Sequence, residues 1–278
     1  MPGFERRHRR ERRLDAVATP YIPGADPIAL DAGGRGVLIL HGFGDTPQSV
    51  AGLASVCHAN GWSVRAPALR GHGSTLLALT KASAGEWLDD ARNALQQLRS
   101  RCSAVAIIGQ SMGGAIATIL AAEEHIDALV LLVPFCEMSP RGRVIARFHR
   151  VVSLFTPHLR SRSDSSILDP IARRNALGRG IATPRLLHEL LLVVRSARRS
   201  AGRVRAPALV IHSRRDPRIS VSDAHSAFNR LGSAEKRLEW VERSGHVISV
   251  DYDRDWVAKT ALAWIDARAR DQAHRTPP

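Results

Sequence analysis

The sequence predicts an α/β fold in which a mostly parallel central sheet has helices on both faces and an inserted helical cap. Short runs rich in Val, Ile and Leu recur without polar alternation, which is typical of strands buried on both faces of a parallel sheet. Longer segments with helical periodicity separate these runs, and this alternation favours an open parallel sheet. One interval, from Val133 to Ala208, spans about 70 residues and exceeds what a plain crossover needs.

The expected elements follow one another along the chain. The predicted strands are the runs at 36–40, 62–65, 105–109, 128–133, 208–212 and 237–241. The predicted helices occupy 47–60, 86–100, 111–124, 221–231 and 253–269, and Arg143–Leu154 and Pro184–Ser200 in the long interval are also helical in pattern. We therefore expect an α/β core of 25–134 and 201–272, a helical cap of 135–200, a disordered basic arm of 1–24 and a tail of 273–278.

The charge is large and unevenly spread. The 278 residues carry a net charge of +14, with six Arg and two Glu in residues 1–13 and thirteen Arg against four acids in 135–200. A nucleic-acid partner is not expected, because no groove-reading motif accompanies the charge. The chain has 37 Arg but only three Lys, so a general bias toward Arg explains part of the positive charge. Three roles stay open for the basic cap: it could contact anionic membrane surfaces, steer anionic substrates to the entrance, or be an ordinary solvated face.

The cysteines and the apolar runs bear on the compartment. Cys57, Cys102 and Cys136 are odd in number and widely spaced, with no CxxC pair and no metal-ligand spacing, which favours three reduced thiols. No apolar run approaches the roughly 18 residues of a membrane span. The basic N-terminus is not followed by an apolar stretch of signal-peptide length. We expect a cytoplasmic protein; its oligomeric state is not predicted.

The segment GQSMGG at 109–114 lies between an expected strand and an expected helix, which is the context of a nucleophile elbow, G-x-S-x-G. The sharp turn strains the serine backbone, and glycine at 109 and 113 avoids a clash. The helix N-terminus favours developing negative charge at Ser111. We therefore expect Ser111 to be a nucleophile rather than part of a plain Gly-rich turn. A dinucleotide loop is disfavoured because Ser111 stands where that motif needs its second glycine.

The loop HGFGDTP at 41–47 follows the first central strand. Attack on an ester carbonyl creates an oxyanion that needs two N–H donors, and losing one costs about 3–4 kcal/mol. The expected donors are the N–H of Met112, directly after the nucleophile, and the N–H of Phe43. His41 is expected to hold the loop through side-chain hydrogen bonds.

A base and an acid follow the last two expected strands. His246 lies in SGHV at 244–247, and Asp216 lies in the loop after the strand at 208–212. An acid there can reach the Nδ1–H of the base and fix its tautomer. Asp223 is the nearest competitor, but at the start of a helix an acid is typical of a first-turn charge. The order Ser…Asp…His is that of the fold that carries the G-x-S-x-G elbow.

These motifs together resemble the bacterial carboxylesterases and monoacylglycerol lipases with a small cap, members of the α/β-hydrolase superfamily. HGFGDTPQSV at 41–50, GQSMGG at 109–114 and SGHVISVDYDRDWV at 244–257 are similar to that group's oxyanion loop, elbow and histidine stretch, and LRGHG at 69–73 and RRDP at 214–217 also fit. The cap of 135–200 matches no motif of the group.

The resemblance implies a Ser111–Asp216–His246 triad, N–H donors from Phe43 and Met112, no cofactor, and short- to medium-chain esters as substrates. We expect an ester or lipid-like small-molecule substrate and, since no metal-ligand spacing is present, no metal. We expect acyl transfer to water through an acyl-enzyme on Ser111. Two alternatives stay open: the same triad could hydrolyse thioesters or carbon–carbon bonds, or the chain could be a non-catalytic ligand-binding relative.

Overall fold

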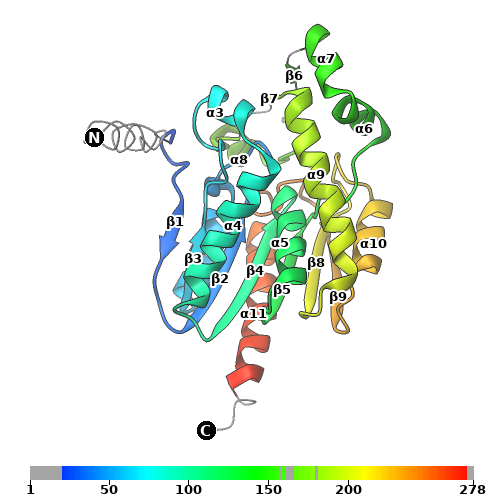
Figure 1. Cartoon of the computed structure of the whole chain (residues 1–278). Helices are drawn as coiled ribbons and strands as arrows, with labels where there is room; N and C mark the ends of the chain where they lie inside the picture. The colour runs from blue at the N-terminus through cyan, green and yellow to red at the C-terminus, as the bar shows by residue number, and fades with distance from the viewer. Residues whose placement is uncertain (1–20, 157, 161–165, 179–180, 274–278) are drawn as a thin grey trace, which may run out of the picture.

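One seven-stranded sheet forms the centre of the molecule (Figure 1). The computed structural model describes residues 21–156, 158–160, 166–178 and 181–273. The strand order is β1-β3-β2-β4-β5-β8-β9. In chain order the strands are β1 (Ile28–Leu30), β2 (Arg35–Leu40), β3 (Trp62–Ala66), β4 (Ala104–Gln110), β5 (Ala128–Leu132), β8 (Ala208–Ser213) and β9 (Lys236–Val241).

The prediction of a mostly parallel sheet is confirmed. Five neighbouring pairs, from β3·β2 to β8·β9, are parallel, and β1 alone pairs antiparallel with β3 at the edge. The sequence did not predict β1, because a strand of three residues is too short to give a recognisable pattern.

Both faces of the sheet are buried, which explains the uninterrupted apolar runs. Along β2, Leu38 and Leu40 pack into one core cluster while Val37 and Ile39 pack into the other. The first cluster lies under α4 (Ala84–Arg99), α5 (Met112–Glu123) and α9 (Pro184–Ser200). The second lies under α2 (Ala51–Ala59) and α11 (Arg254–Ala273). The short helices η1 (Pro47–Val50), α3 (Leu76–Lys81), η3 (Ala201–Arg203) and α10 (Val221–Arg230) complete this part of the chain.

Local capping explains where two of the predicted helices begin. Ser83 and Glu86 form a capping box at the start of α4, with each side chain bonded to the backbone N–H of the other residue. Ser220 and Asp223 form the same arrangement at the start of α10. Asp223 is therefore a helix-capping carboxylate, as expected of an acid in a first turn.

The long interval between β5 and β8 is helical, but its first helix is broken. The sequence pattern suggested one helix over Arg143–Leu154, whereas the chain forms α6 (Pro140–Arg147) and α7 (His149–Phe155), which meet at Phe148. There follow β6 (Leu159–Arg160), α8 (Pro170–Asn175) and β7 (Ile181–Ala182). Helix α9 packs against α5 as well as α6 and α7, and the division of the chain into core and cap stays a prediction.

The described residues leave out most of both predicted terminal segments and include all three cysteines. Nearly all of the predicted basic arm (residues 1–20) and most of the predicted tail (274–278) lie outside the described residues. Cys57, Cys102 and Cys136 are free thiols, and the first of them is buried. Across the described ranges, we find no helix with both the length and the apolarity that crossing a bilayer requires.

Candidate active site

Ser111 occupies the turn between β4 and α5 in a strained conformation. Its φ of 55° and ψ of −116° lie outside the usual regions for a residue with a side chain, a strain of roughly 1–3 kcal/mol. A Cβ at Gly113 would lie 2.2 Å from the carbonyl oxygen of Leu40, and one at Gly109 would lie 2.3 Å from the carbonyl oxygen of Gly113. Only glycine fits at both positions, Gly113 because β2 passes close to the elbow and Gly109 because the turn folds back on itself.

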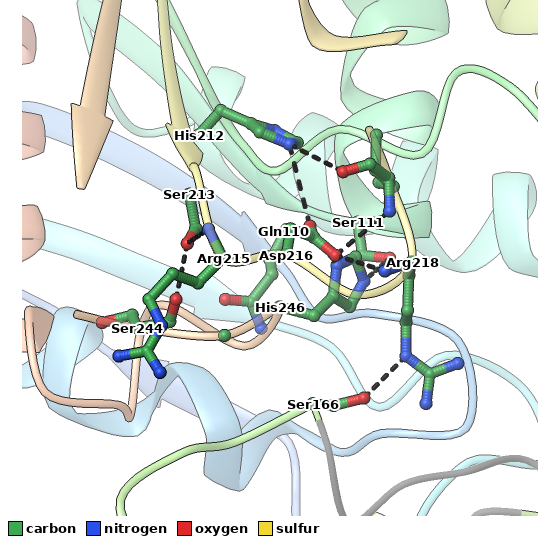
Figure 2. A network of polar contacts seen from close by, with 12 residues as sticks. Gln110, Ser111, Ser166, His212, Ser213, Arg215, Asp216, Arg218, Ser244 and His246 are labelled. Atoms are coloured by element: carbon green, nitrogen blue, oxygen red, sulfur yellow. Dashed lines mark hydrogen bonds and ion pairs between the residues drawn. The ribbon is translucent and has the colours of Figure 1, made fainter. Parts of the chain in front are cut away.

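The three predicted side chains form one hydrogen-bonded chain at the carboxyl ends of β4, β8 and β9 (Figure 2). Nε2 of His246 lies 2.8 Å from Oγ of Ser111. Nδ1 of the same ring lies 2.7 Å from Oδ2 of Asp216. When the Nδ1–H donates to the carboxylate, Nε2 is left to accept the serine proton.

Asp216 is held as an oriented anion. Its side chain is fully buried, and Oδ1 accepts the backbone N–H of Arg218 at 2.7 Å and that of Ile219 at 3.1 Å. Burial by itself would raise the pKa of Asp216, but the hydrogen bond and charge of His246 and the N–H of Arg218 hold that pKa below its ordinary value. The carboxylate is therefore ionised wherever His246 is to act as a base.

His212 is a neighbour of the acid that the sequence did not assign to the site. Its ring is fully buried at the end of β8, with Nε2 3.3 Å from the carbonyl oxygen of Ile219 and 3.8 Å from Oδ2 of Asp216. Burial is the main reason that its pKa is lowered. His212 is therefore a core histidine, and its contact with the acid loop depends on how the chain turns after β8.

The loop after β2 lies against the nucleophile. A Cβ at Gly42 would lie 3.3 Å from the Cβ of Ser111, so the loop backbone runs beside the serine. His41 holds this loop as predicted: its Nδ1 bonds the carbonyl of Gly42 at 2.9 Å, and its Nε2 accepts the N–H of Leu69 at 3.1 Å. Burial lowers the pKa of His41 to about 3, and backbone groups occupy both ring nitrogens, so the ring is too weakly basic to take a proton near neutral pH.

The two predicted oxyanion donors come from different elements: Met112 directly follows the serine in the chain, and Phe43 lies on the loop after β2. Met112 is the first residue of α5, so its N–H has no acceptor within the helix. Phe43 is half-buried on the loop after β2, and its ring meets those of His72 and Trp87 edge-on, with centroids 6.1 and 6.0 Å away. This aromatic packing fixes the segment that carries the Phe43 N–H.

No metal centre is evident in the part of the chain that the structure describes, where no three His, Cys, Asp or Glu side chains are grouped to hold an ion. The chemistry that the arrangement can perform is nucleophilic attack by an activated hydroxyl.

The fold and this arrangement define an α/β-hydrolase. The chain belongs to the family described as serine aminopeptidase, S33, whose model matches residues 34–253. It is 27% identical over 250 residues to a thermostable monoacylglycerol lipase of Bacillus sp. (strain H-257), covering 90% of this chain and 98% of that one. It is 24% identical to a carboxylesterase of Bacillus subtilis (strain 168), covering 86% and 96% of the two chains.

A solved structure confirms the likeness in three dimensions. A structure from work on LipS and LipT, two metagenome-derived lipolytic enzymes, superposes with a TM-score of 0.82 at 28% identity. The match covers 89% of this chain and all of that one.

Proposed function

We propose that this protein hydrolyses carboxylic esters through an acyl-enzyme on Ser111. One observation carries the proposal: Ser111, His246 and Asp216 are joined by hydrogen bonds of 2.8 and 2.7 Å at one edge of the sheet. The names of the relatives, a monoacylglycerol lipase and a carboxylesterase, favour ester or lipid-like substrates for this chain too.

The reaction runs in two halves. His246 takes the proton of Ser111 as its Oγ attacks the carbonyl carbon, and Asp216 stabilises the imidazolium that forms. The N–H groups of Met112 and Phe43 bind the oxyanion. His246 then gives its proton to the leaving alcohol, the acyl group stays on Ser111, and a water activated by the same imidazole releases the acid.

The experiment is hydrolysis of p-nitrophenyl esters of short and medium acyl length by the purified chain. Ser111→Ala should lower kcat by at least about 10³-fold, because no other hydroxyl among the described residues is hydrogen-bonded to the base. Ser63→Ala is the matched control: Ser63 is buried in β3 and its hydroxyl donates to the carbonyl of Gly33. Full activity in Ser111→Ala would refute the nucleophile assignment.

A panel of substrates distinguishes ester hydrolysis from the other reactions that the same three residues could catalyse. A panel of an ester, a thioester, a carbon–carbon substrate and an aminoacyl anilide tests ester chemistry against its alternatives, including the aminopeptidase activity in the family's description. Labelling by a fluorophosphonate separates all of these from a non-catalytic binding protein, whose serine would not be activated.

We also propose that the surface of α6 and α7 contacts the anionic cytoplasmic face of a membrane. Five large apolar side chains are exposed there, and that of Phe155 is 82% accessible. Residues 140–155 contain no acidic residue, and their arginines are exposed. Apolar residues bordered by basic ones are typical of peripheral lipid binding. The apolar set is Val144, Phe148, Val151, Leu154 and Phe155.

Vesicle flotation tests this contact. Of the four arginines in 140–155, Arg143 is paired with Glu137, and the other three, Arg141, Arg147 and Arg150, together contribute about 3 kcal/mol. Binding should therefore be about 10²-fold stronger on vesicles with anionic lipid than on neutral ones and should weaken with salt. Arg147→Ser should reduce binding, whereas Arg101→Ser, which removes a 66%-exposed arginine beyond the end of α4, should not. Equal binding to both kinds of vesicle at any salt concentration would contradict the proposal.

A further inference from the structure

The segment 166–169, which returns from the inserted helices, lies directly against the loop that carries His246. The carbonyl oxygen of Ser166 accepts the backbone N–H of His246 at 2.8 Å and that of Val247 at 3.0 Å. Ser166 is buried, and it is 80 positions from His246 along the chain. The main chain of the candidate base is thus hydrogen-bonded to the inserted segment.

Asp251 joins the same two pieces of chain through its side chain. The carboxylate is fully buried and accepts four backbone N–H groups. Oδ2 accepts those of Leu168 and Gly245, both at 2.7 Å, and Oδ1 accepts those of Asp169 at 2.8 Å and Tyr252 at 2.9 Å. Two donors belong to the inserted segment and one to the residue before His246, so this carboxylate fixes the distance between them.

The loop that carries Asp216 is hydrogen-bonded to the same segment, 166–169. The hydroxyl of Ser166 accepts a hydrogen bond from Nε of Arg218 at 2.6 Å, and the backbone N–H of Arg218 donates to Asp216 at 2.7 Å (Figure 2). Ser166 therefore contacts both loops whose side chains must meet, the one with the base and the one with the acid.

We propose that Asp251 and Ser166 are positioning residues, which hold His246 within reach of Ser111 by anchoring its loop to the inserted segment. The inference rests on the proposed function for the role of His246. Its physical basis is that a displacement of about 1 Å at a catalytic group can cost about 10²-fold in rate. A carboxylate suits the position because both of its oxygens can accept two N–H groups, whereas an amide offers one acceptor oxygen and would turn its own N–H₂ toward two donors.

Asp251→Asn is the direct test, and Asp127→Asn is its matched control. Asp127 is also a buried carboxylate that accepts a backbone N–H, that of Val105 at 2.5 Å, but it lies at the opposite edge of the sheet. A purely structural role would lower thermal stability in both variants and leave the folded protein equally reactive. We expect fluorophosphonate labelling of Ser111 to be at least about 10-fold slower in Asp251→Asn and within twofold of wild type in Asp127→Asn.

A spectroscopic signature makes the test independent of activity. The proton between His246 and Asp216 should give a far-downfield ¹H resonance, which we expect to be lost in Asp251→Asn and kept in Asp127→Asn. A folded Asp251→Asn protein that labels at the wild-type rate and keeps this resonance overturns the proposal. If the wild type itself is not labelled, the proposed function fails, and the resonance alone decides whether Asp251 positions the imidazole.

A second pair of variants covers the case in which Asp251→Asn does not fold. Ser166→Ala removes only the hydroxyl that meets Arg218, and we expect labelling to slow by threefold or more. Ser200→Ala is the control, because Ser200 is also a buried serine whose hydroxyl accepts an arginine N–H, from Arg203 at 3.2 Å. Equal labelling of these two variants, with Asp251→Asn unfolded, overturns the proposal as well.

Discussion

Replacing Asp216 by asparagine would test whether the acid acts by fixing the tautomer of His246. In the wild type one carboxylate oxygen accepts two backbone N–H groups, from Arg218 at 2.7 Å and Ile219 at 3.1 Å, while the other faces Nδ1 of His246 at 2.7 Å. In the Asp216→Asn variant, the new amide would keep its oxygen on the two backbone donors. Its N–H₂ would then face Nδ1, the ring would carry its proton on Nε2, and Nε2 could not accept the proton of Ser111.

The size of the effect follows from the alternative orientation. Turning the amide oxygen toward His246 would restore the active tautomer but leave the N–H groups of Arg218 and Ile219 without an acceptor. The side chain at this position is fully buried, so each N–H that loses its acceptor there costs about 1–3 kcal/mol, and the active orientation is disfavoured by about 2–6 kcal/mol. The expected fall in kcat is therefore about 30-fold to 10⁴-fold.

The assay is hydrolysis of p-nitrophenyl butyrate near neutral pH, with Asp223→Asn as the control. Asp223 lies seven positions further on and caps α10, so its replacement should leave kcat within twofold. A kcat for Asp216→Asn within fivefold of wild type would refute the tautomer argument.

Two further predictions concern Gly113 in the elbow and the buried ring of His72. Gly113→Ala should reduce ester hydrolysis by at least about 10²-fold, because the new Cβ would lie 2.2 Å from the carbonyl oxygen of Leu40. Gly52→Ala in α2 is the control, because a Cβ there meets nothing within 4 Å, and it should keep full activity. Equal activity of the two variants would contradict the steric argument. Burial lowers the pKa of His72 to about 4, so the unfolded chain binds a proton near pH 6.5 that the folded chain does not. The free energy of unfolding should therefore be greatest above pH 6.5 and fall by up to about 1.4 kcal/mol per pH unit between pH 6.5 and 4 for this histidine. Urea unfolding at about pH 7, 6 and 5 should show a smaller fall for His72→Gln, and identical falls would exclude His72 as a cause.

The fold could be predicted from sequence where the signal is local. A strand buried on both faces needs a continuous apolar run, as in β4 and β5, and the elbow needs glycine at 109 and 113 because other side chains would clash. The positions of Ser111, Asp216 and His246 at strand ends followed from the same patterns, since the carboxyl ends of parallel strands meet at one edge. The break between α6 and α7 could not be predicted, because the apolar periodicity continues across Phe148 whereas the helical conformation of the backbone is interrupted there.

The sequence by itself determined the order of the elements and the identity of the three residues that meet at the sheet edge, because steric and periodic constraints act between near neighbours in the chain. Only the tertiary structure decided how those residues are held in register. The carbonyl of Ser166 and the N–H groups bound by Asp251 are main-chain groups that nearly every residue carries. The sequence around Asp251 therefore does not show which distant N–H groups its carboxylate accepts. Their pairing arises only when segments some 80 positions apart fold against each other.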